Sequence, residues 1–343
     1  MTDTATVDAD TDADADADAD GDAIVLETSG LAKRFGADDC DRVLTGVELS
    51  VRKGEILLLM GPNGVGKTVL LSCLAGSEPP TDGSIERFGE PTNGGSDRLD
   101  FMLQDSMLEP KLTGRENVAF YRDLHPQCTD RWRTYTDRLG IADDLDDAVE
   151  TYSEGMKRKL EFALTMSGEA SIYLLDEPTA GIDLHNVQQF HDIICSQNDR
   201  GRTVVVSSHR PMDANVADRI AFMPDGTSGA TGTPEVLLAS VPPVLTVTGR
   251  AAMDNAAAFV RNERLFAVGG EARGFLAEGV SFGDVERALA ETPGSVEETD
   301  PTYTDLFNYY VHVDGNGNGN GNGNGNGNEN GNGNGNGNGG RSR

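Results

Sequence analysis

Short apolar runs alternate with amphipathic stretches along the middle of the chain. The runs that predict strands lie at residues 23–27, 47–51, 56–60, 172–175 and 204–207. Continuous apolar runs of this length are typical of parallel strands that are buried on both faces. The alternation of strands and helices therefore predicts an α/β fold with a central parallel sheet.

The stretch 105–170 differs, because it contains no strong strand signal. Its periodicity predicts helices instead, for example at 114–124 and 128–139. We expect it to form a helical subdomain inserted between two strands of the sheet. Turn signals at Asp225-Gly226 and Gly232-Thr233-Pro234 then end a first domain that spans residues 23–237.

A second pattern begins at residue 244. It predicts strand 244–248, helix 253–262, strands 264–268 and 274–278, helix 282–291, strand 295–298 and a final helix at 303–311. The order β-α-β-β-α-β is the ferredoxin-like arrangement, so residues 244–312 predict a small α+β domain. Because no candidate catalytic cluster lies in this stretch, we expect an accessory domain.

Both ends of the chain are of low complexity. Residues 1–22 are mostly Asp alternating with Ala or Thr, and residues 315–343 are mostly a Gly-Asn repeat. Neither segment has apolar surface to bury, so both are predicted to be disordered.

The composition is strongly acidic, with a formal net charge of −29 and only six Lys against 22 Arg. Nucleic acids and anionic lipids bind basic surfaces, so this charge disfavours both as partners. Excess acidic surface keeps a protein hydrated in concentrated salt, and we interpret the charge as the sign of a salt-loving, halophilic organism.

The four Cys residues are dispersed and form no CxxC pair or metal-ligand spacing. This pattern predicts neither structural zinc nor a redox dithiol, and it favours a reducing cytosol. The first residues lack the apolar core of a signal peptide, and no apolar run approaches the roughly 18 residues of a membrane span. We therefore expect a protein that is soluble by itself.

The strongest motif is a glycine-rich loop that follows the apolar strand at 56–60 and opens a helix. It comprises Gly61, Pro62, Asn63, Gly64, Val65, Gly66, Lys67 and Thr68. This is the G-x-x-x-x-G-K-[ST] pattern in its required strand–loop–helix context. Its backbone N–H groups can cradle phosphate oxygens, Lys67 can contact the β- and γ-phosphates of ATP, and Thr68 can ligate Mg²⁺.

An acidic pair, Asp176 and Glu177, ends the apolar strand at 172–175. Asp176 is placed to hold Mg²⁺. Glu177 is placed to orient or deprotonate an attacking water. Four apolar residues before the pair and Pro178 after it argue against an ordinary acidic pair on the surface.

Two further polar residues also follow strand-like runs. Gln104 comes after Phe101-Met102-Leu103, and its amide could bind Mg²⁺ and water and sense the γ-phosphate. His209 ends the strand at 204–208. Side chains at the carboxyl ends of parallel strands point into the ligand crevice, so His209 could donate a hydrogen bond to the γ-phosphate.

Ser153 and Gly155 precede a predicted helix at 156–165. Ser153 could be a simple N-cap of that helix. Alternatively, the same helix start could meet the γ-phosphate of ATP bound to a partner subunit. The spacing leaves both interpretations open.

Together these motifs resemble the nucleotide-binding subunits of ABC transporters, over roughly residues 24–237. GPNGVGKT is similar to their Walker A motif, Gln104 to the Q-loop, YSEGM to the signature, LLDE to Walker B, AGID to the D-loop and His209 to the switch histidine. The resemblance implies that Phe35 stacks on adenine and that Asp183 of the D-loop belongs to the ATP site.

The same resemblance implies a mechanism and partners. Two Mg²⁺-bound ATP molecules would be sandwiched between Walker A of one subunit and the signature of another, in a homodimer. ATP hydrolysis would drive a separate multi-span permease, whose coupling helix would dock near Gln104, Met107 and Leu108. The ATPase would then lie on the inner face of the cell membrane.

The chain also departs from the family pattern. The signature is YSEGM where LSGGQ is usual, a variant of exporter-like members, and we expect Glu154 to point away from the phosphate. Ala180 replaces the usual D-loop Ser. The ending at 300–310 resembles exporter ATPase tails, closest to the ATPase of the transporter that helps to mature nitrous oxide reductase.

Two other functions are alternatives to transport. An ABC ATPase of DNA repair or chromosome organisation is disfavoured, because the acidic surface repels DNA and no long coiled coil separates Lys67 from Asp176. A soluble ABC ATPase that assembles metal clusters or cofactors without a permease is compatible with the same catalytic motifs.

Overall fold

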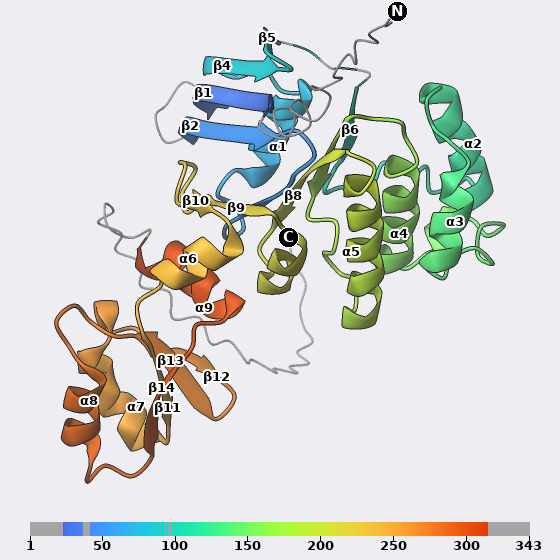
Figure 1. Cartoon of the computed structure of the whole chain (residues 1–343). Helices are drawn as coiled ribbons and strands as arrows, with labels where there is room; N and C mark the ends of the chain where they lie inside the picture. Colours follow the sequence, from blue (N-terminus) through green and yellow to red (C-terminus); the bar gives the residue numbers. More distant parts are fainter. Residues whose placement is uncertain (1–22, 37–41, 93, 95, 97, 315–343) are drawn as a thin grey trace, which may run out of the picture.

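The computed structural model describes residues 23–36, 42–92, 94, 96 and 98–314. The two ends that are predicted to be disordered lie outside the described residues. The described chain forms an α/β core, a helical subdomain beside it and a separate small sheet domain (Figure 1). In the described part of the chain, every helix is too short or too polar to cross a bilayer.

The core contains a six-stranded sheet with the order β10-β9-β3-β8-β7-β6. Its strands are β3 (Ile56–Met60), β6 (Leu99–Met102), β7 (Ile172–Asp176), β8 (Thr203–Ser208), β9 (Arg219–Phe222) and β10 (Thr231–Gly232). All neighbours from β9 to β6 are parallel, and only β10 is antiparallel. The predicted parallel sheet is therefore present.

Helices cover both faces of this sheet. Leu57 and Leu59 of β3 pack in one cluster with helix α1 (Lys67–Ala75), whereas Ile56, Leu58 and Met60 pack in a second cluster with α5 (Leu184–Asn198). Successive side chains of a strand point to opposite faces, so burial on both faces requires a continuous apolar run. The runs predicted at 56–60, 172–175 and 204–207 have this property.

The first two strands were assigned to the wrong sheet. The runs at 23–27 and 47–51 belong to β1 (Ile24–Arg34) and β2 (Arg42–Arg52), in an antiparallel sheet of order β2-β1-β4-β5. Both strands are only partly buried and packed on one face, as is common for antiparallel sheets. Strands β4 (Asp82–Arg87) and β5 (Glu90–Pro91) were missed because they are polar and exposed.

The helical subdomain is built from α2 (Gly114–Leu124), α3 (Arg131–Arg138) and α4 (Glu154–Thr165). Helix α2 begins and ends as predicted, and Thr113 and Glu116 form its capping box. Helix α3 begins later than predicted, because residues 125–129 form a turn in which Thr129 donates its N–H to Ser167. Val118, Trp132 and Leu160 share the subdomain's own small core.

The C-terminal region has the predicted element order. Its sheet is β12-β13-β11-β14, with β11 (Val244–Thr248), β12 (Phe266–Val268), β13 (Glu271–Phe275) and β14 (Ser295–Thr299), all antiparallel to their neighbours. Helices α7 (Arg250–Ala256) and α8 (Phe282–Leu289) pack with it. A ferredoxin-like relationship stays a prediction.

Two elements of this domain depart most from their predicted bounds. The helix predicted at 253–262 is α7, which ends at Ala256, and the chain then reverses through left-handed Asn262 and Glu263 (φ 55° and 53°). The strand predicted at 274–278 is β13, which lies three residues earlier. Turns made by non-glycine residues carry little sequence signal.

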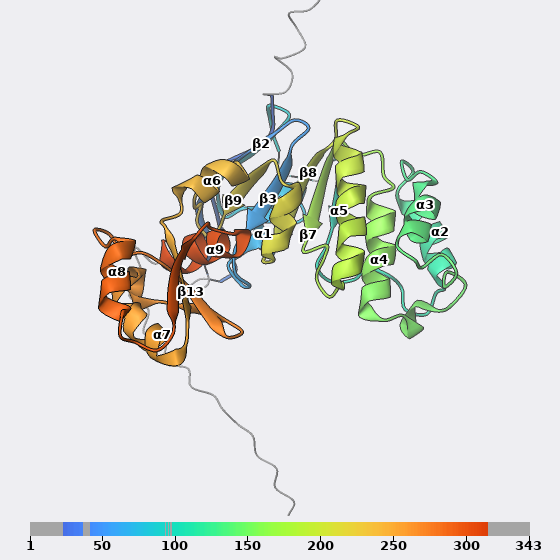
Figure 2. The ribbon, with the colours of Figure 1, turned by 60° about the horizontal axis from the view of Figure 1, so that its bottom comes forward.

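The last segment joins the two domains. Helix α6 (Pro234–Ser240) lies beside α9 (Tyr303–Asn308), which continues into a π-helical turn, Tyr309–Val313 (Figure 2). Tyr310 stacks on Phe222 of the core at 4.7 Å, while Tyr309 packs edge-on against Phe275 of the small sheet at 5.3 Å. The segment that was predicted as part of the accessory domain therefore also packs on the α/β core.

Candidate nucleotide site at the carboxyl ends of the central strands

The phosphate-binding loop joins β3 to α1 and depends on close backbone approach. A Cβ atom on Gly61 would lie 2.2 Å from the carbonyl oxygen of Met223, and one on Gly66 would lie 2.9 Å from the Leu44 side chain. Gly66 is also left-handed, with φ 98°. Among the described residues, no side chain caps α1, so the N–H groups of its first turn can bind an anion.

Lys67 is held inside this loop. Its Nζ donates to the carbonyl oxygens of Gly61 at 2.8 Å and Pro62 at 2.9 Å, and it lies 3.6 Å from the Glu177 carboxylate. Burial lowers the pKa of Lys67, while Glu177 and Asp176 act in the opposite direction. The loop therefore keeps a buried cation at the place where phosphate is expected.

Asp176 is the last residue of β7 and is completely buried. The Ser207 hydroxyl donates to Oδ1, but Oδ2 has no hydrogen-bond partner among the described residues. A buried carboxylate oxygen without a partner costs free energy unless a cation or donor reaches it.

Two other oxygen atoms have the chemistry of ligands for a divalent cation. The Thr68 hydroxyl lies 3.5 Å from the side-chain oxygen of Gln104, which follows β6. Carboxylate, amide and hydroxyl oxygens suit Mg²⁺, and the free Oδ2 of Asp176 is the kind of atom that a cation satisfies. Thr68, Gln104 and Asp176 therefore fit the metal that the sequence predicts.

Glu177 has a strained backbone with φ 47°. Its N–H donates to the carbonyl oxygen of Ser207 at 3.2 Å and to the Ser207 hydroxyl at 3.0 Å. Its carboxylate lies 3.1 Å from Nδ1 of His209 as well as close to Lys67. Left-handed non-glycine residues cost on the order of 1–3 kcal/mol and cluster at functional sites. The structure thus brings together Lys67, Glu177 and His209.

Ser153 and Gly155 do not join this cluster within one chain. Ser153 is the N-cap of α4 and accepts the Met156 N–H at 3.2 Å, which was one of the two interpretations left open. A Cβ on Gly155 would lie 3.8 Å from the carbonyl oxygen of Gly181 in the AGID loop. The signature turn therefore borders the D-loop of its own chain.

The remaining predicted residues lie at the surface. Glu154 keeps 85% of its side chain exposed and pairs with Lys157 at 2.7 Å. Asp183 caps α5, and hydrogen bonds from Asn186 lower its pKa. Phe35 follows β1 with its ring mostly exposed and the Lys33 ammonium 5.0 Å from the ring centroid. An exposed ring can stack on a base, and this role stays a prediction.

Sequence reasoning missed the buried residues that support the site. Asp213 accepts from the hydroxyls of Thr179 at 3.0 Å and Ser208 at 2.6 Å, and lies 2.8 Å from Nε2 of His191. Burial alone would raise the pKa of Asp213, but these partners lower it overall. Ser207 and Arg158 were missed too. None of them lies in a motif with a mechanism, so only the tertiary contacts identify them.

Known proteins are similar to this chain in sequence. A family model described as "ABC transporter" matches residues 44–180. A fluoroquinolones export ATP-binding protein of Mycobacterium tuberculosis is 33% identical over 218 residues, which cover 62% of this chain and 72% of that protein. The daunorubicin/doxorubicin resistance ATP-binding protein DrrA of Streptomyces peucetius is 32% identical, with 63% and 67% covered.

Solved structures agree on the fold. The ATP-binding subunit of an ABC transporter superposes with a TM-score of 0.55 at 22% identity, covering 62% of this chain and 91% of that one. A dimeric bacterial ABC transporter cassette gives a TM-score of 0.56 at 22% identity, covering 61% and 98%. The chain therefore belongs to the ABC transporter family, as an ATP-binding subunit with ATPase activity.

Proposed function

We propose that two copies of this chain pair around two Mg²⁺-bound ATP molecules and drive a separate membrane permease. The observation that carries the proposal is the contact of the Glu177 carboxylate with both Lys67 and His209, directly behind the phosphate loop. In this proposal the base, the cation and the polar ring surround the γ-phosphate, and their mutual contacts support it.

Each residue has a chemical task in this proposal. Lys67 exchanges the carbonyl oxygens of Gly61 and Pro62 for phosphate oxygens. Glu177 then orients water and accepts its proton, while His209 holds the carboxylate and donates to the phosphate. Mg²⁺ held by Thr68, Gln104 and Asp176 would neutralise charge on the phosphates.

The second copy completes the site. Ser153 and Gly155 start a helix whose free N–H groups favour an anion, yet they border the D-loop of their own chain. The dimeric cassette among the similar structures supports pairing, with Ser153, Gly155 and Asp183 of one copy facing the ATP of the other.

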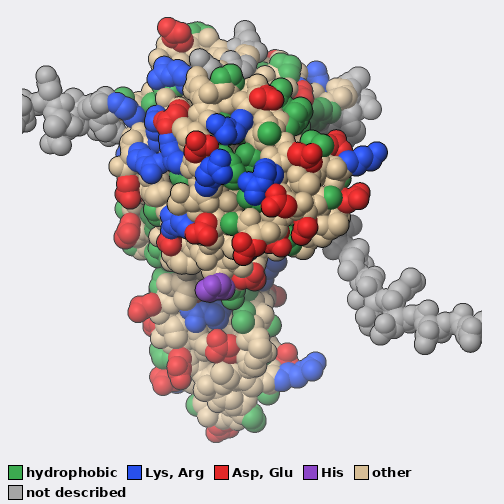
Figure 3. Space-filling model, turned by 90° about the vertical axis from the view of Figure 1, so that its right-hand side faces the viewer, with side chains coloured by type: hydrophobic (Ala, Val, Ile, Leu, Met, Phe, Trp, Pro, Cys, Tyr) green, Lys and Arg blue, Asp and Glu red, His purple; other side chains and the backbone are tan. Residues whose placement is uncertain are grey.

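An exposed apolar groove is the proposed docking place for the permease. It has a volume of about 390 Å³ and lies between the segment that carries Gln104 and the helical subdomain. Met107, Phe120 and Leu124 line it and are exposed by 72%, 52% and 62%. Apolar side chains lie among charged ones on this side of the molecule (Figure 3). Exposed apolar patches mark interaction sites, and a short amphipathic helix of a permease fits this groove.

The direction of transport is proposed from the relatives. Those reported above are named for drug export or drug resistance, which supports an exporter. An assembly ATPase without a permease is the alternative function.

Co-expression with a multi-span permease encoded beside this chain tests the proposal. We expect the parent protein to sediment with the permease in membranes, and Phe120→Glu to remain in the supernatant with unchanged basal ATPase activity. Val236→Glu is the matched control, because Val236 is a similarly exposed apolar residue on α6, outside the groove. A parent protein that stays in the supernatant beside the permease would contradict transport and favour the assembly ATPase.

A further inference from the structure

Arg158 of α4 connects three parts of the catalytic domain. Its Nη1 donates to the carbonyl oxygens of Leu103 at 2.6 Å and Gln104 at 3.0 Å. Its Nη2 donates to the carbonyl oxygens of Asp176 and, at 3.0 Å, Glu177. One guanidinium from the helical subdomain thus holds the main chain of both segments that carry predicted magnesium ligands.

The side chain is almost fully buried, with 9% exposed. A buried charge is costly unless it is paired and hydrogen-bonded. Four carbonyl oxygens accept from Nη1 and Nη2, and the carboxylate of Glu161 lies 3.7 Å from Nη1, whereas Nε has no hydrogen-bond partner among the described residues. The planar fork of Arg reaches acceptors on two sides, whereas Lys has a single nitrogen.

The contacts to Glu177 fix a residue whose backbone is strained. Ser207 accepts its N–H, and Arg158 donates to its carbonyl oxygen, so both peptide groups that flank its Cα are held. This clamp maintains φ at 47° and directs the carboxylate toward Lys67 and His209. Strained backbone persists only where surrounding contacts determine it.

The same helix also contacts the groove. Glu161, one turn after Arg158, accepts the N–H of Met107 at 2.6 Å, and Met107 lines the groove. A displacement of the helical subdomain would therefore move Arg158 together with the groove wall.

We propose that Arg158 is a positioning residue for ATP hydrolysis, which sets Glu177 and Gln104 through their main-chain carbonyls and couples both to the helical subdomain. The inference rests on the proposed role of Glu177. Because Arg158 is assigned no contact with ATP, replacing Arg158 should lower kcat and leave the KM for ATP nearly unchanged.

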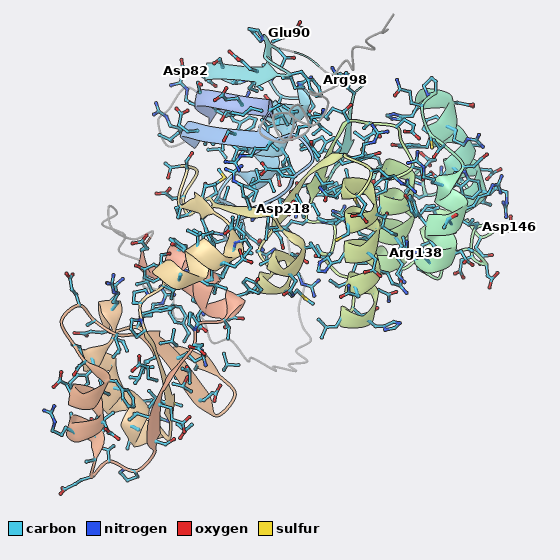
Figure 4. The ribbon with its side chains drawn as sticks, in the orientation of Figure 1. Asp82, Glu90, Arg98, Arg138, Asp146 and Asp218 are labelled. Carbon is cyan, nitrogen blue, oxygen red and sulfur yellow. The ribbon has the colours of Figure 1, made fainter. Side chains whose placement is uncertain are left out.

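The test uses the full chain without a permease, and measures kcat, the KM for ATP and thermal unfolding. We expect Arg158→Gln to lower kcat at least about tenfold with KM changed less than about threefold, as for a residue that acts in the transition state alone. Arg158→Lys should recover part of kcat. Arg115→Gln is the matched control, because Arg115 pairs with Asp146 at the outer rim of the same subdomain (Figure 4).

A folded Arg158→Gln protein with parental kcat, or with a raised KM and unchanged kcat, would overturn the inference. If Arg158→Gln does not fold, Arg158→Lys decides, since a reduced kcat supports positioning and a parental kcat refutes it. Adding Arg158→Gln to Glu177→Gln should change residual turnover little, whereas a purely structural role would reduce it further. Parental turnover in Glu177→Gln alone would refute the proposed function instead.

Discussion

Two buried carboxylates, Asp176 of the central sheet and Asp305 of the C-terminal helix α9, differ in whether their oxygens have partners. In the central sheet, Asp176 keeps one buried oxygen without a partner, and the backbone of Glu177 is strained. In the C-terminal region, Asp305 is also buried, but Arg273 donates to both of its oxygens and Thr302 donates to Oδ2 as well. Satisfied groups stabilise a fold, whereas an unsatisfied buried group is available for a ligand. An unsatisfied oxygen thus distinguishes Asp176, a candidate for ligand binding, from Asp305, which stabilises the C-terminal region.

The largest expected effect comes from Glu177, the residue with the strained backbone. Glu177→Gln should lower turnover by about 10²- to 10⁴-fold, because the amide cannot accept a proton from water. ATP binding should persist, and an ATP-bound dimer should accumulate. Phosphate release measures turnover, and light scattering of the protein as it elutes from a sizing column measures the dimer. Unchanged turnover would show that Glu177 is not the base.

The next largest effect is expected when the hydroxyl group that donates to Asp176 is removed. The Ser207 hydroxyl donates to Asp176, so Ser207→Ala should weaken Mg²⁺ affinity about 10- to 100-fold, as the loss of an outer-shell partner does. Titrating ATPase activity with Mg²⁺ measures this, and saturating Mg²⁺ should restore the activity only in part, because the Ser207 hydroxyl also accepts the N–H of Glu177. An unchanged titration midpoint would place Mg²⁺ elsewhere.

In the C-terminal domain the effect should be on stability alone. Asp305→Ala leaves Arg273 partly buried without its partner and should cost about 3 kcal/mol, seen as an earlier thermal transition. Asp284→Ala, which removes an exposed capping carboxylate of α8, should cost less. Basal ATPase activity should not change in either variant. A fall in kcat with Asp305→Ala would show that the C-terminal segment also serves catalysis.

The smallest expected effect is a pH-dependent change in stability at Asp100, a third carboxyl. Burial raises the pKa of Asp100, on β6, to about 6 from its ordinary value of 3.8. Between about pH 4 and pH 6 the folded state retains a proton that the unfolded state has released, so this carboxyl lowers stability as the pH rises through that window. Asp100→Asn should add about 2 kcal/mol at pH 7 and almost nothing at pH 4. Urea unfolding at several pH values tests this, and a gain that does not depend on pH would contradict it.

Much of the site could be predicted from sequence, because its residues lie in contiguous motifs. The phosphate loop, the acidic pair, Gln104 and His209 each follow a strand, and parallel strands bring their carboxyl ends to one edge of the sheet. Ser207, Asp213 and Arg158 could not be predicted. Each acts through a partner that is distant in the chain, and the residue type alone does not indicate that partner.

The strands also divide into those that could be predicted from the sequence and those that could not. The longer strands that are buried on both faces, β3, β7 and β8, were found, because their apolar runs are continuous. The strands β4, β5, β9 and β10 were missed, and β1 and β2 were placed in the wrong sheet. Those strands are short, polar or packed on one face only, so their pairing depends on neighbours and not on their own pattern.

By itself, the sequence determined the family, the α/β class, the phosphate loop and the strand ends that carry the chemistry. The tertiary structure decided which sheet the first strands join, that the last helix packs on the core, and that Arg158 holds the catalytic segments. The physical reason is that periodicity and motifs record local requirements, such as burial on two faces or a tight glycine turn. Hydrogen bonds and ion pairs between distant segments exist only after packing brings those segments together.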